Sequence, residues 1–356
     1  TRPSSTPTPK LSPSDRTQPL MGGVKRLIEF LKANPVAVMA ASGLASLLLY
    51  YQFILLPATL ADNFTTHLLD FSTVIHSSAL KGLAVLAVFA LLAGMYFLSW
   101  WAAGFTNNRD AWLLTVGFGL AFGILLLFMY PYGAADIFDY IMHARIISVY
   151  HANPFFETIG LYPSDPFYDY AFWKSTPAQY GPLWELISAV PAKLAGDSII
   201  NTVLAFKGTV GIFYLASVGM VALILRRQAP QRALAGTLLF AWNPMVLYET
   251  FGNGHNDIVM VFFILLAAWA MSRRFYALAI VALTAGTMAK YMPILLIPAA
   301  GLIALREIKT NWQRLRYILV AGISSALFVA ICFAPFWEGL STLTVLKRAI
   351  LYTSSF

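Results

Sequence analysis

Long apolar runs recur along almost the whole chain, and they constrain its fold more than any other feature. A helix of about 20 apolar residues crosses a bilayer. Runs of this length, or nearly so, cover residues 35–57, 83–105, 111–131, 199–225, 233–251, 257–272, 275–290, 292–306 and 317–336. A shorter apolar piece covers 183–195, and residues 340–356 begin another amphipathic or membrane-dipping segment. The sequence therefore predicts an all-α integral membrane protein, a polytopic helical bundle of about 9–11 spans.

Composition excludes a soluble globular enzyme. The chain has 356 residues, of which 59% are hydrophobic and 11% are charged. A soluble domain is typically about half apolar and about a quarter charged. A core of ordinary size could not bury this much apolar surface. The chain has one cysteine, Cys332, so no disulfide can form within it.

The chain divides into a tail and a bundle. Its start is rich in Ser, Thr and Pro, and we expect residues 1–33 to be a disordered cytoplasmic tail. Residues 34–356 form the transmembrane bundle, which includes an outer loop over 132–182. The chain lacks an initiator Met and stops in mid-pattern at Phe356, which is typical of a fragment of a longer protein.

The basic residues set the orientation. A cytoplasmic N-terminus, with each run crossing once, places most of the 24 Lys and Arg residues in the cytoplasm, as the positive-inside rule requires. The acidic residues on that side are Asp15, Glu29, Asp110 and Glu307, out of 16. We therefore expect a plasma-membrane protein whose active site is extracytoplasmic. The net charge of +8 reflects this sidedness and does not predict a nucleic-acid partner.

No nucleotide-binding signature is present. The sequence contains neither GxGxxG nor a P-loop. The longest stretch off the membrane, 132–182, is too short for a nucleotide-binding fold. The sequence therefore predicts no nucleotide-binding site.

The outer loop begins with an acidic pair. Asp136 and Asp139 follow the helix breakers that end the third run, and we expect a helix from 137 to about 150 with Asp136 as its N-cap. Helical spacing places both carboxylates and His143 on one face, away from lipid, in an amphipathic helix on the outer leaflet. Arg145 would lie on the apolar side, where it can reach a lipid phosphate.

This pair has two interpretations. An N-cap and an acid in the first turn would stabilise the helix dipole without any catalytic role. Alternatively, two neighbouring carboxylates in a partly desolvated site raise each other's pKa, so that one can act as a general base on a sugar hydroxyl.

Aromatic residues are dense in the rest of the loop. Interfacial Trp and Tyr explain most of them. Interleaved with polar side chains, they would also suit the apolar faces of a sugar. Gln179, Tyr180 and Trp184, where the chain returns to the membrane, are the candidates for sugar or acceptor binding.

Two later outer segments carry polar groups at the same membrane depth as Asp136. His255, Asn256 and Asp257 lie between two apolar runs, either as a capped hairpin or as part of the site, where Asn256 and Asp257 are further candidates for sugar or acceptor binding. Lys290 separates two further runs. A lysine near membrane depth is costly, so it either snorkels to the interface or holds a lipid phosphate. Pro244, in the middle of the 233–251 run, is expected to kink that helix.

These motifs together resemble the GT-C superfamily of membrane glycosyltransferases, and most closely the bacterial polyprenol-phosphomannose-dependent alpha-mannosyltransferases. The motifs that carry the resemblance span 130–295: Asp136-Ile137-Phe138-Asp139-Tyr140, Tyr180-Gly181-Pro182-Leu183-Trp184, Trp242-Asn243-Pro244, Gly252-Asn253-Gly254-His255-Asn256-Asp257 and Lys290-Tyr291-Met292-Pro293.

The resemblance implies an inverting glycosyltransferase of the cell envelope. It would move a sugar, mannose by likeness, from a polyprenyl-phosphate donor to a glycan or lipid-glycan acceptor. Asp136 would be the base, with Asp139 or His143 orienting it; which aspartate is the base stays open. Lys290, Arg145 and His255 would offset the charge of the leaving phosphate. The resemblance implies no required cofactor, although Asp136 and Asp139 could form a weak Mg²⁺ or Mn²⁺ site.

A transporter or flippase of lipid-linked or anionic substrates is the alternative function. It would place polar residues at mid-bilayer depth on several helices, whereas here the acids gather at one face.

Overall fold

The computed structural model describes residues 23, 25–64, 79–342 and 344. Within this part of the chain the regular structure is helical, and no β-strand occurs beyond an isolated antiparallel bridge between Thr59 and Met129. Five of the described segments are long and apolar enough to cross a membrane: Pro35–Ala58, Leu80–Ala103, Arg109–Leu127, Ile199–Gln228 and Asn311–Phe336. The all-α, polytopic membrane class is confirmed.

The N-terminal part of the bundle contains α2 (Pro35–Leu49), α4 (Ala79–Ala103) and α5 (Arg109–Leu127). The first span continues from α2 through the π-helix η1 (Tyr50–Leu55) and the short 3-10 helix η2 (Leu56–Ala58). Its end is hydrogen-bonded to the end of α5. The N–H of Leu60 donates to the carbonyl of Phe128 over 2.7 Å, and the N–H of Tyr130 donates to that of Ala58 over 2.8 Å. This junction fixes where the chain leaves α5.

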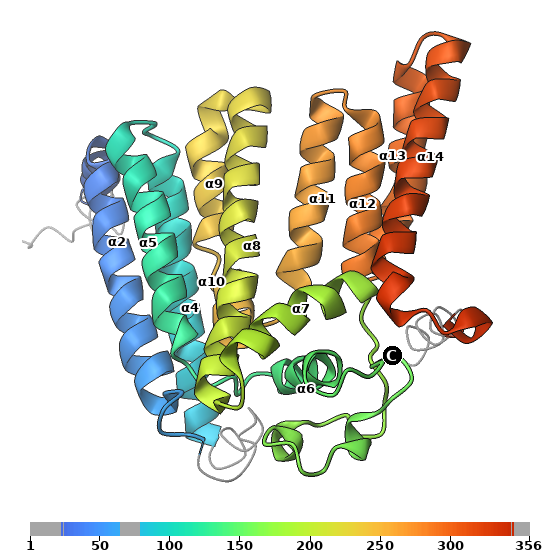
Figure 1. Cartoon of the computed structure of the whole chain (residues 1–356). Helices are drawn as coiled ribbons and strands as arrows, with labels where there is room; N and C mark the ends of the chain where they lie inside the picture. Colours follow the sequence, from blue (N-terminus) through green and yellow to red (C-terminus); the bar gives the residue numbers. More distant parts are fainter. Residues whose placement is uncertain (1–22, 24, 65–78, 343, 345–356) are drawn as a thin grey trace, which may run out of the picture.

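The long helix α8 (Ile199–Gln228) stands in the middle of the bundle and packs against α7, α9 and α11 (Figure 1). After η5 (Pro230–Arg232), the predicted 233–251 run forms α9 (Ala233–Ala241), α10 (Pro244–Leu247) and the π-helix η6 (Tyr248–Gly252). We expected Pro244 to kink a continuous helix, but the helix is interrupted there: α9 ends at Ala241, and α10 begins at Pro244 after an extended Asn243. The Asn243 side chain caps α10 by accepting the N–H groups of Met245 and Val246.

The C-terminal part contains α11 (Asp257–Ser272), α12 (Tyr276–Ala289), η7 (Met292–Leu295), α13 (Leu296–Glu307), α14 (Asn311–Phe333), η8 (Ala334–Phe336) and η9 (Gly339–Thr342). The two helices α11 and α12 pack as a hairpin, and α12 also packs against α14. Of the predicted segment 340–356, only residues 340–342 and 344 are described.

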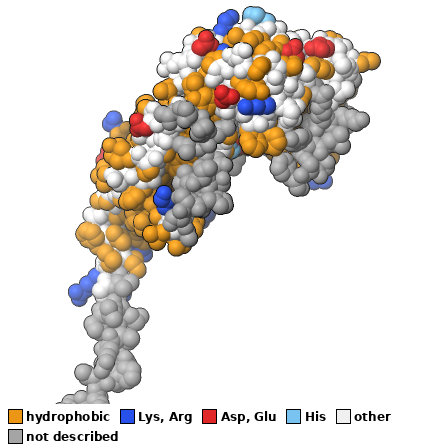
Figure 2. Space-filling view, turned by 90° about the horizontal axis from the view of Figure 1, so that it is seen from below, with side chains coloured by type: hydrophobic (Ala, Val, Ile, Leu, Met, Phe, Trp, Pro, Cys, Tyr) orange, Lys and Arg blue, Asp and Glu red, His pale blue; other side chains and the backbone are white. Residues whose placement is uncertain are grey.

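Two shorter helices lie across one end of the bundle. Figure 1 shows α6 (Asp136–Ser148) and α7 (Pro182–Ala195) at the end where the loop with η3 (Ile159–Leu161) and η4 (Tyr168–Tyr170) also lies. The space-filling view from this end (Figure 2) shows Asp and Glu side chains at several separate places and hydrophobic side chains along the flank. Many large apolar side chains are exposed, as lipid contact requires, among them Leu48, Leu86 and Ile212.

Three local expectations are wrong. Residues 25–33 are helical, so the predicted disordered tail of 1–33 is too long; residues 1–22 and 24 lie outside the described residues. The helix α6 starts at Asp136 and has Ala135 as its N-cap, without a capping side chain, and it ends at Ser148.

The third error concerns the environment of α6. We expected one face on lipid and one in water, but side chains from Ile137 to Ile146 are buried all round. Helices α7 and α8 cover part of the surface of α6, and the loop that follows α6 contributes hydrogen bonds to it. A sequence pattern gives the faces of a helix but not the number of neighbours that cover them.

Candidate functional site

The connection between α5 and α6 is held against the turn that precedes α11. The N–H of Gly133 donates to Oδ1 of Asn253 over 3.1 Å. Asn253 follows η6, and its neighbour Gly254 has a φ of +75°, a conformation that side-chain-bearing residues rarely adopt. A Cβ on Gly254 would also lie 2.5 Å from Ile137, in the first turn of α6. This close contact brings Asp136 next to His255.

Charged side chains from three elements surround His255. Its Nε2 lies 3.7 Å from Oδ2 of Asp136, at the start of α6. Its Nδ1 lies 3.3 Å from Oε2 of Glu249, in η6, and 3.9 Å from Oδ2 of Asp257, at the start of α11. These side chains are partly exposed, so a substrate can reach them.

Lys290 joins the same cluster from the C-cap position that follows α12 (Tyr276–Ala289). Its Nζ lies 2.6 Å from Oδ1 of Asp257 and 5.5 Å from the centre of the Tyr180 ring. Tyr180 is held there by its neighbour Gly181, whose N–H donates to the carbonyl of Ala289 over 3.1 Å. A Cβ on Gly181 would lie 2.0 Å from the carbonyl oxygen of Met288, so only glycine permits this approach. The loop is therefore docked directly on the end of α12.

Asp139 anchors the loop instead of facing solvent. It is buried, and its Oδ1 accepts the N–H groups of Phe172 and Trp173, both over 3.0 Å, while Oδ2 has no hydrogen-bond partner. Burial raises the pKa of this carboxyl to about 7, although the two N–H groups lower it in part. The expected exposed carboxylate pair is therefore wrong: Asp136 is partly exposed and Asp139 is not.

His143 is buried on the same helix, one turn after Asp139. Burial lowers the pKa of its imidazole to about 4, so the ring is neutral at physiological pH. Its predicted role, to orient a catalytic aspartate, stays a prediction.

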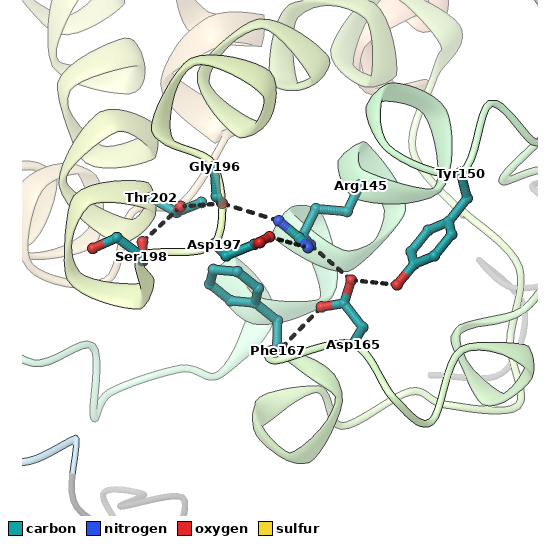
Figure 3. A network of polar contacts seen from close by, with 8 residues as sticks. All are labelled: Arg145, Tyr150, Asp165, Phe167, Gly196, Asp197, Ser198 and Thr202. Carbon is teal, nitrogen blue, oxygen red and sulfur yellow. Dashed lines mark hydrogen bonds and ion pairs between the residues drawn. The ribbon is translucent and has the colours of Figure 1, made fainter.

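Arg145 is the buried centre of a polar network (Figure 3). Its guanidinium donates to Asp165 over 2.8 Å, to Asp197 over 2.7 Å and to the carbonyl of Gly196 over 2.9 Å, and it lies on the Phe167 ring. The expectation that this side chain snorkels to lipid phosphate is wrong, because each of its three guanidinium nitrogens donates a hydrogen bond to the protein. The network ties α6 to the outer loop and to the start of α8.

The other predicted sugar-binding residues occupy different environments. Trp184 is fully buried between Tyr140 and Phe206, and its Nε1 has no partner. Tyr140 donates to the hydroxyl of Tyr180 over 3.1 Å. Asn256 is buried beside His255, and its Oδ1 is unpartnered. Gln179 is partly buried. The structure thus brings Tyr180 to the charged cluster and places Trp184 in the core.

Sequence reasoning missed three charged residues. Glu249 contacts His255 from η6. Lys207, fully buried in α8, donates to the carbonyls of Leu127 and Met129 at the end of α5. Glu185, fully buried in α7, has an unpartnered Oε2, and burial raises its pKa to about 8. Each lies in or beside an apolar run, and a charged residue in such a run was the signal that could have identified them.

Among the described residues, no group of three or more His, Cys, Asp and Glu side chains is arranged to hold a metal ion. The Asp139 carboxylate that would share such a site with Asp136 is engaged by the loop. A divalent-cation requirement stays a question for experiment.

Comparison with known proteins identifies two likenesses. A family model described as "Alpha-(1->6)-mannopyranosyltransferase, N-terminal domain" matches residues 40–306, a range that contains every residue of the cluster. The chain is also similar to alpha-(1->6)-mannopyranosyltransferase B of Corynebacterium glutamicum, with 26% identity over 143 residues. That match covers 38% of this chain and 23% of the relative. No solved structure matches the chain.

Proposed function

The chain belongs to the alpha-(1->6)-mannopyranosyltransferase family, and we propose that it transfers mannose from a polyprenyl-phosphate donor to a hydroxyl of a glycan or lipid-glycan. One observation carries the proposal: Asp136, His255, Asp257 and Lys290 meet at one end of an apolar bundle. A cation beside a carboxylate, at the rim of a lipid-embedded bundle, suits a reaction in which an acceptor hydroxyl displaces a lipid phosphate from the anomeric carbon of a sugar.

We place this end of the bundle outside the cell. Basic residues occupy the connections at the opposite end, including Arg226, Arg227, Arg273 and Arg274. Positively charged loops remain in the cytoplasm. The donor would then lie in the outer leaflet, with its phosphate at the depth of Lys290.

Asp136 is the candidate base on the acceptor hydroxyl. It is the aspartate of the acidic pair that is partly exposed, and it faces His255. As the acceptor oxygen bonds to the anomeric carbon, the bond to the donor phosphate breaks and its electron pair stays on the phosphate. An inverting reaction requires the base and the leaving group on opposite sides of the sugar, as in inverting glycosidases.

Lys290 is the candidate for the phosphate. Its ammonium has three donors, of which Asp257 engages one. His255 is a weaker candidate for that role than Lys290, because both its ring nitrogens face carboxylates.

The test is Asp136→Asn in purified full chain, supplied with a panel of radiolabelled polyprenyl-phosphate sugars. Removal of a general base is expected to reduce transfer by about 10²–10⁴-fold. Asp169→Asn, the same change at an exposed position of the outer loop, is expected to leave transfer unchanged. Normal turnover by Asp136→Asn would reject this base. Movement of intact donor across a vesicle membrane, without sugar transfer, would instead support the transport alternative.

A further inference from the structure

A short helix precedes the first span, at the end of the bundle opposite the His255 cluster. Residues 25–33 are helical, and α2 begins at Pro35. Asn34 separates the two helices with a φ of −124° and a ψ of 51°, because a following proline disfavours the α-helical conformation. The backbone N–H and the side-chain Nδ2 of Asn34 donate to the carbonyl of Phe30 over 3.1 and 2.9 Å, which ends the first helix. Figure 1 shows the start of α2 at the end opposite α6 and α7.

One face of this helix is apolar and largely uncovered by protein. Leu27, Phe30 and Leu31 lie three or four residues apart and therefore share a face, and Ile28 lies at its border. Leu31 packs against the core of the bundle, whereas 57% of Leu27 and 63% of Phe30 is exposed. Contiguous exposed apolar side chains of this kind indicate an apolar partner.

The opposite face carries positive charge. Lys25, Glu29 and Lys32 lie on it at helical spacing and Arg26 lies at its edge, so the helix has three cations and one acid. Within the described part of the chain, none of the three cations lies within ion-pair distance of a carboxylate. The Nζ of Lys32 lies 5.4 Å from the centre of the Phe105 ring, between α4 and α5, so the last turn contacts the bundle. These cations are therefore available to an anionic partner.

The connection to α2 places the helix at a membrane surface. The segment that begins with α2 is long and apolar enough to cross a membrane, and only Asn34 separates it from residues 25–33. No residue of the helix can then lie farther from that end of the span than the length of the helix, about 14 Å. A helix with cations on one face and Leu and Phe on the other lies in the boundary between headgroups and acyl chains.

We propose that residues 25–33 form an interfacial anchor that binds the surface of a bilayer containing anionic phospholipids. The apolar face enters the boundary between headgroups and acyl chains, and Lys25, Arg26 and Lys32 contact lipid phosphates. The bilayer supplies both the apolar medium and the negative charge that the two faces require. The anchor fixes the depth at which α2 enters the membrane. This role goes beyond sugar transfer and does not depend on it.

Spin labels on the whole chain, reconstituted in lipid nanodiscs, test the depth of this helix. Cys332 is the only cysteine, so a Cys332→Ala background allows one labelled position at a time. Phe30→Cys reports from the apolar face, and Glu29→Cys, the adjacent position on the charged face, is the matched control. In discs of equal parts phosphatidylcholine and phosphatidylglycerol, oxygen dissolved in lipid should relax the label at position 30 more than a water-soluble nickel chelate does, with the opposite order at position 29. If Phe30→Cys does not fold, as judged by size-exclusion chromatography, Leu27→Cys reports from the same face.

The lipid charge is tested with the same label in discs of phosphatidylcholine alone. The two components of its spectrum give the ratio of membrane-bound to free helix, which should be lower in these discs than in the mixed ones. Each Lys or Arg near an anionic surface changes binding by about fivefold. Lys25→Gln should therefore lower the ratio by about fivefold in mixed discs and by less than about twofold in phosphatidylcholine. Lys193→Gln, the same change at an exposed position near the end of α7, should leave both ratios unchanged.

Three results would overturn the proposal. Greater access of nickel than of oxygen at position 30 would place the apolar face in water. Equal ratios in the two kinds of disc would remove the preference for anionic lipid. A label at position 30 shielded from both oxygen and nickel would indicate a protein partner or a second copy of the chain instead of lipid. None of these readouts uses sugar transfer, so failure of the anchor and failure of the proposed function are distinguishable.

Discussion

The ammonium of Lys290 lies 2.6 Å from the carboxylate of Asp257, although α11 and α12 separate the two residues in sequence. Asp257 begins α11 and Lys290 follows the last residue of α12. Because the two helices pack as a hairpin, both residues return to the same end of the bundle. The hairpin therefore delivers a cation and a carboxylate together to the partly exposed cluster around His255.

Removal of the Lys290 cation should weaken donor binding more than acceptor binding. A charge-assisted hydrogen bond contributes about 1.5–3 kcal/mol, so Lys290→Ala is expected to raise the dissociation constant for a polyprenyl-phosphate sugar by about 10–100-fold. Lys290→Arg, which keeps the charge, should lose less. Separate titrations of donor and acceptor measure the two affinities, and Lys174→Ala, a loop lysine stacked on Tyr168, is the control. Equal weakening for both substrates would contradict the phosphate role.

The two carboxylates that bind Arg145 should contribute very differently to stability. The Asp165 side chain is 0% exposed and that of Asp197 is 79% exposed. Arg145→Met leaves Asp165 buried without its cation and is expected to reduce the free energy of unfolding by about 3–5 kcal/mol. Asp197→Asn removes an exposed partner and should cost less than about 1 kcal/mol. Denaturant titration in detergent measures both free energies of unfolding. Comparable losses in the two variants would show that the buried Arg145–Asp165 pair in Figure 3 does not stabilise α6 more than the exposed Asp197 contact does.

Glu185 should make the protein less stable as the pH rises. The pKa of Glu185 is about 8 in the folded protein, whereas an unperturbed glutamate has a pKa of 4.5. Between these two pH values the folded protein holds a proton that the unfolded chain has lost. Stability must therefore fall as the pH increases from 4.5 to 8. His143 acts in the opposite direction, but only between about 4 and 6.5.

The comparison is best made between pH 6.5 and 9, where His143 no longer contributes. Glu185→Gln cannot ionise, so its melting temperature should decrease less over this range than that of the wild type. Thermal unfolding in detergent gives the two slopes. Parallel slopes would mean that Glu185 is solvated or paired in the folded protein.

Gly181 should tolerate no side chain. Gly181→Ala would place a Cβ 2.0 Å from the carbonyl oxygen of Met288, and the loop that carries Tyr180 would have to move away from α12. Since a tenfold loss of rate corresponds to only about 1.4 kcal/mol, we expect transfer to fall by more than tenfold. In contrast, Gly208→Ala in α8 meets no atom within 4 Å and should be neutral or stabilising by up to about 1 kcal/mol. An active Gly181→Ala protein would show that the docking of this loop is dispensable.

The sequence predicted the bundle well because each apolar run carries its own evidence. A helix satisfies its backbone hydrogen bonds internally, so the length of a run and its Pro and Gly residues are enough to place it. The breaks at Pro244 and before Asp136 were readable in this way. The common end of Asp136, His255 and Lys290 also followed from counting the runs.

The burial of the α6 side chains could not be predicted from the sequence. Asp139, His143 and Arg145 lie on a helix whose spacing is correct, but spacing does not reveal that other segments cover it. Glu249 was missed because it lies in a π-helical turn after α10, where a regular helical pattern does not apply.

The amino-acid sequence by itself determined that this chain is a helical membrane protein with polar groups gathered at one end of its spans. Only the tertiary structure decided that Asp136 faces His255, that Asp139 and Arg145 secure the loop, and that Glu249 contacts the imidazole. The reason is physical: crossing a bilayer depends on the apolarity of each segment alone, whereas the environment of a charged side chain depends on segments distant in sequence that pack over it.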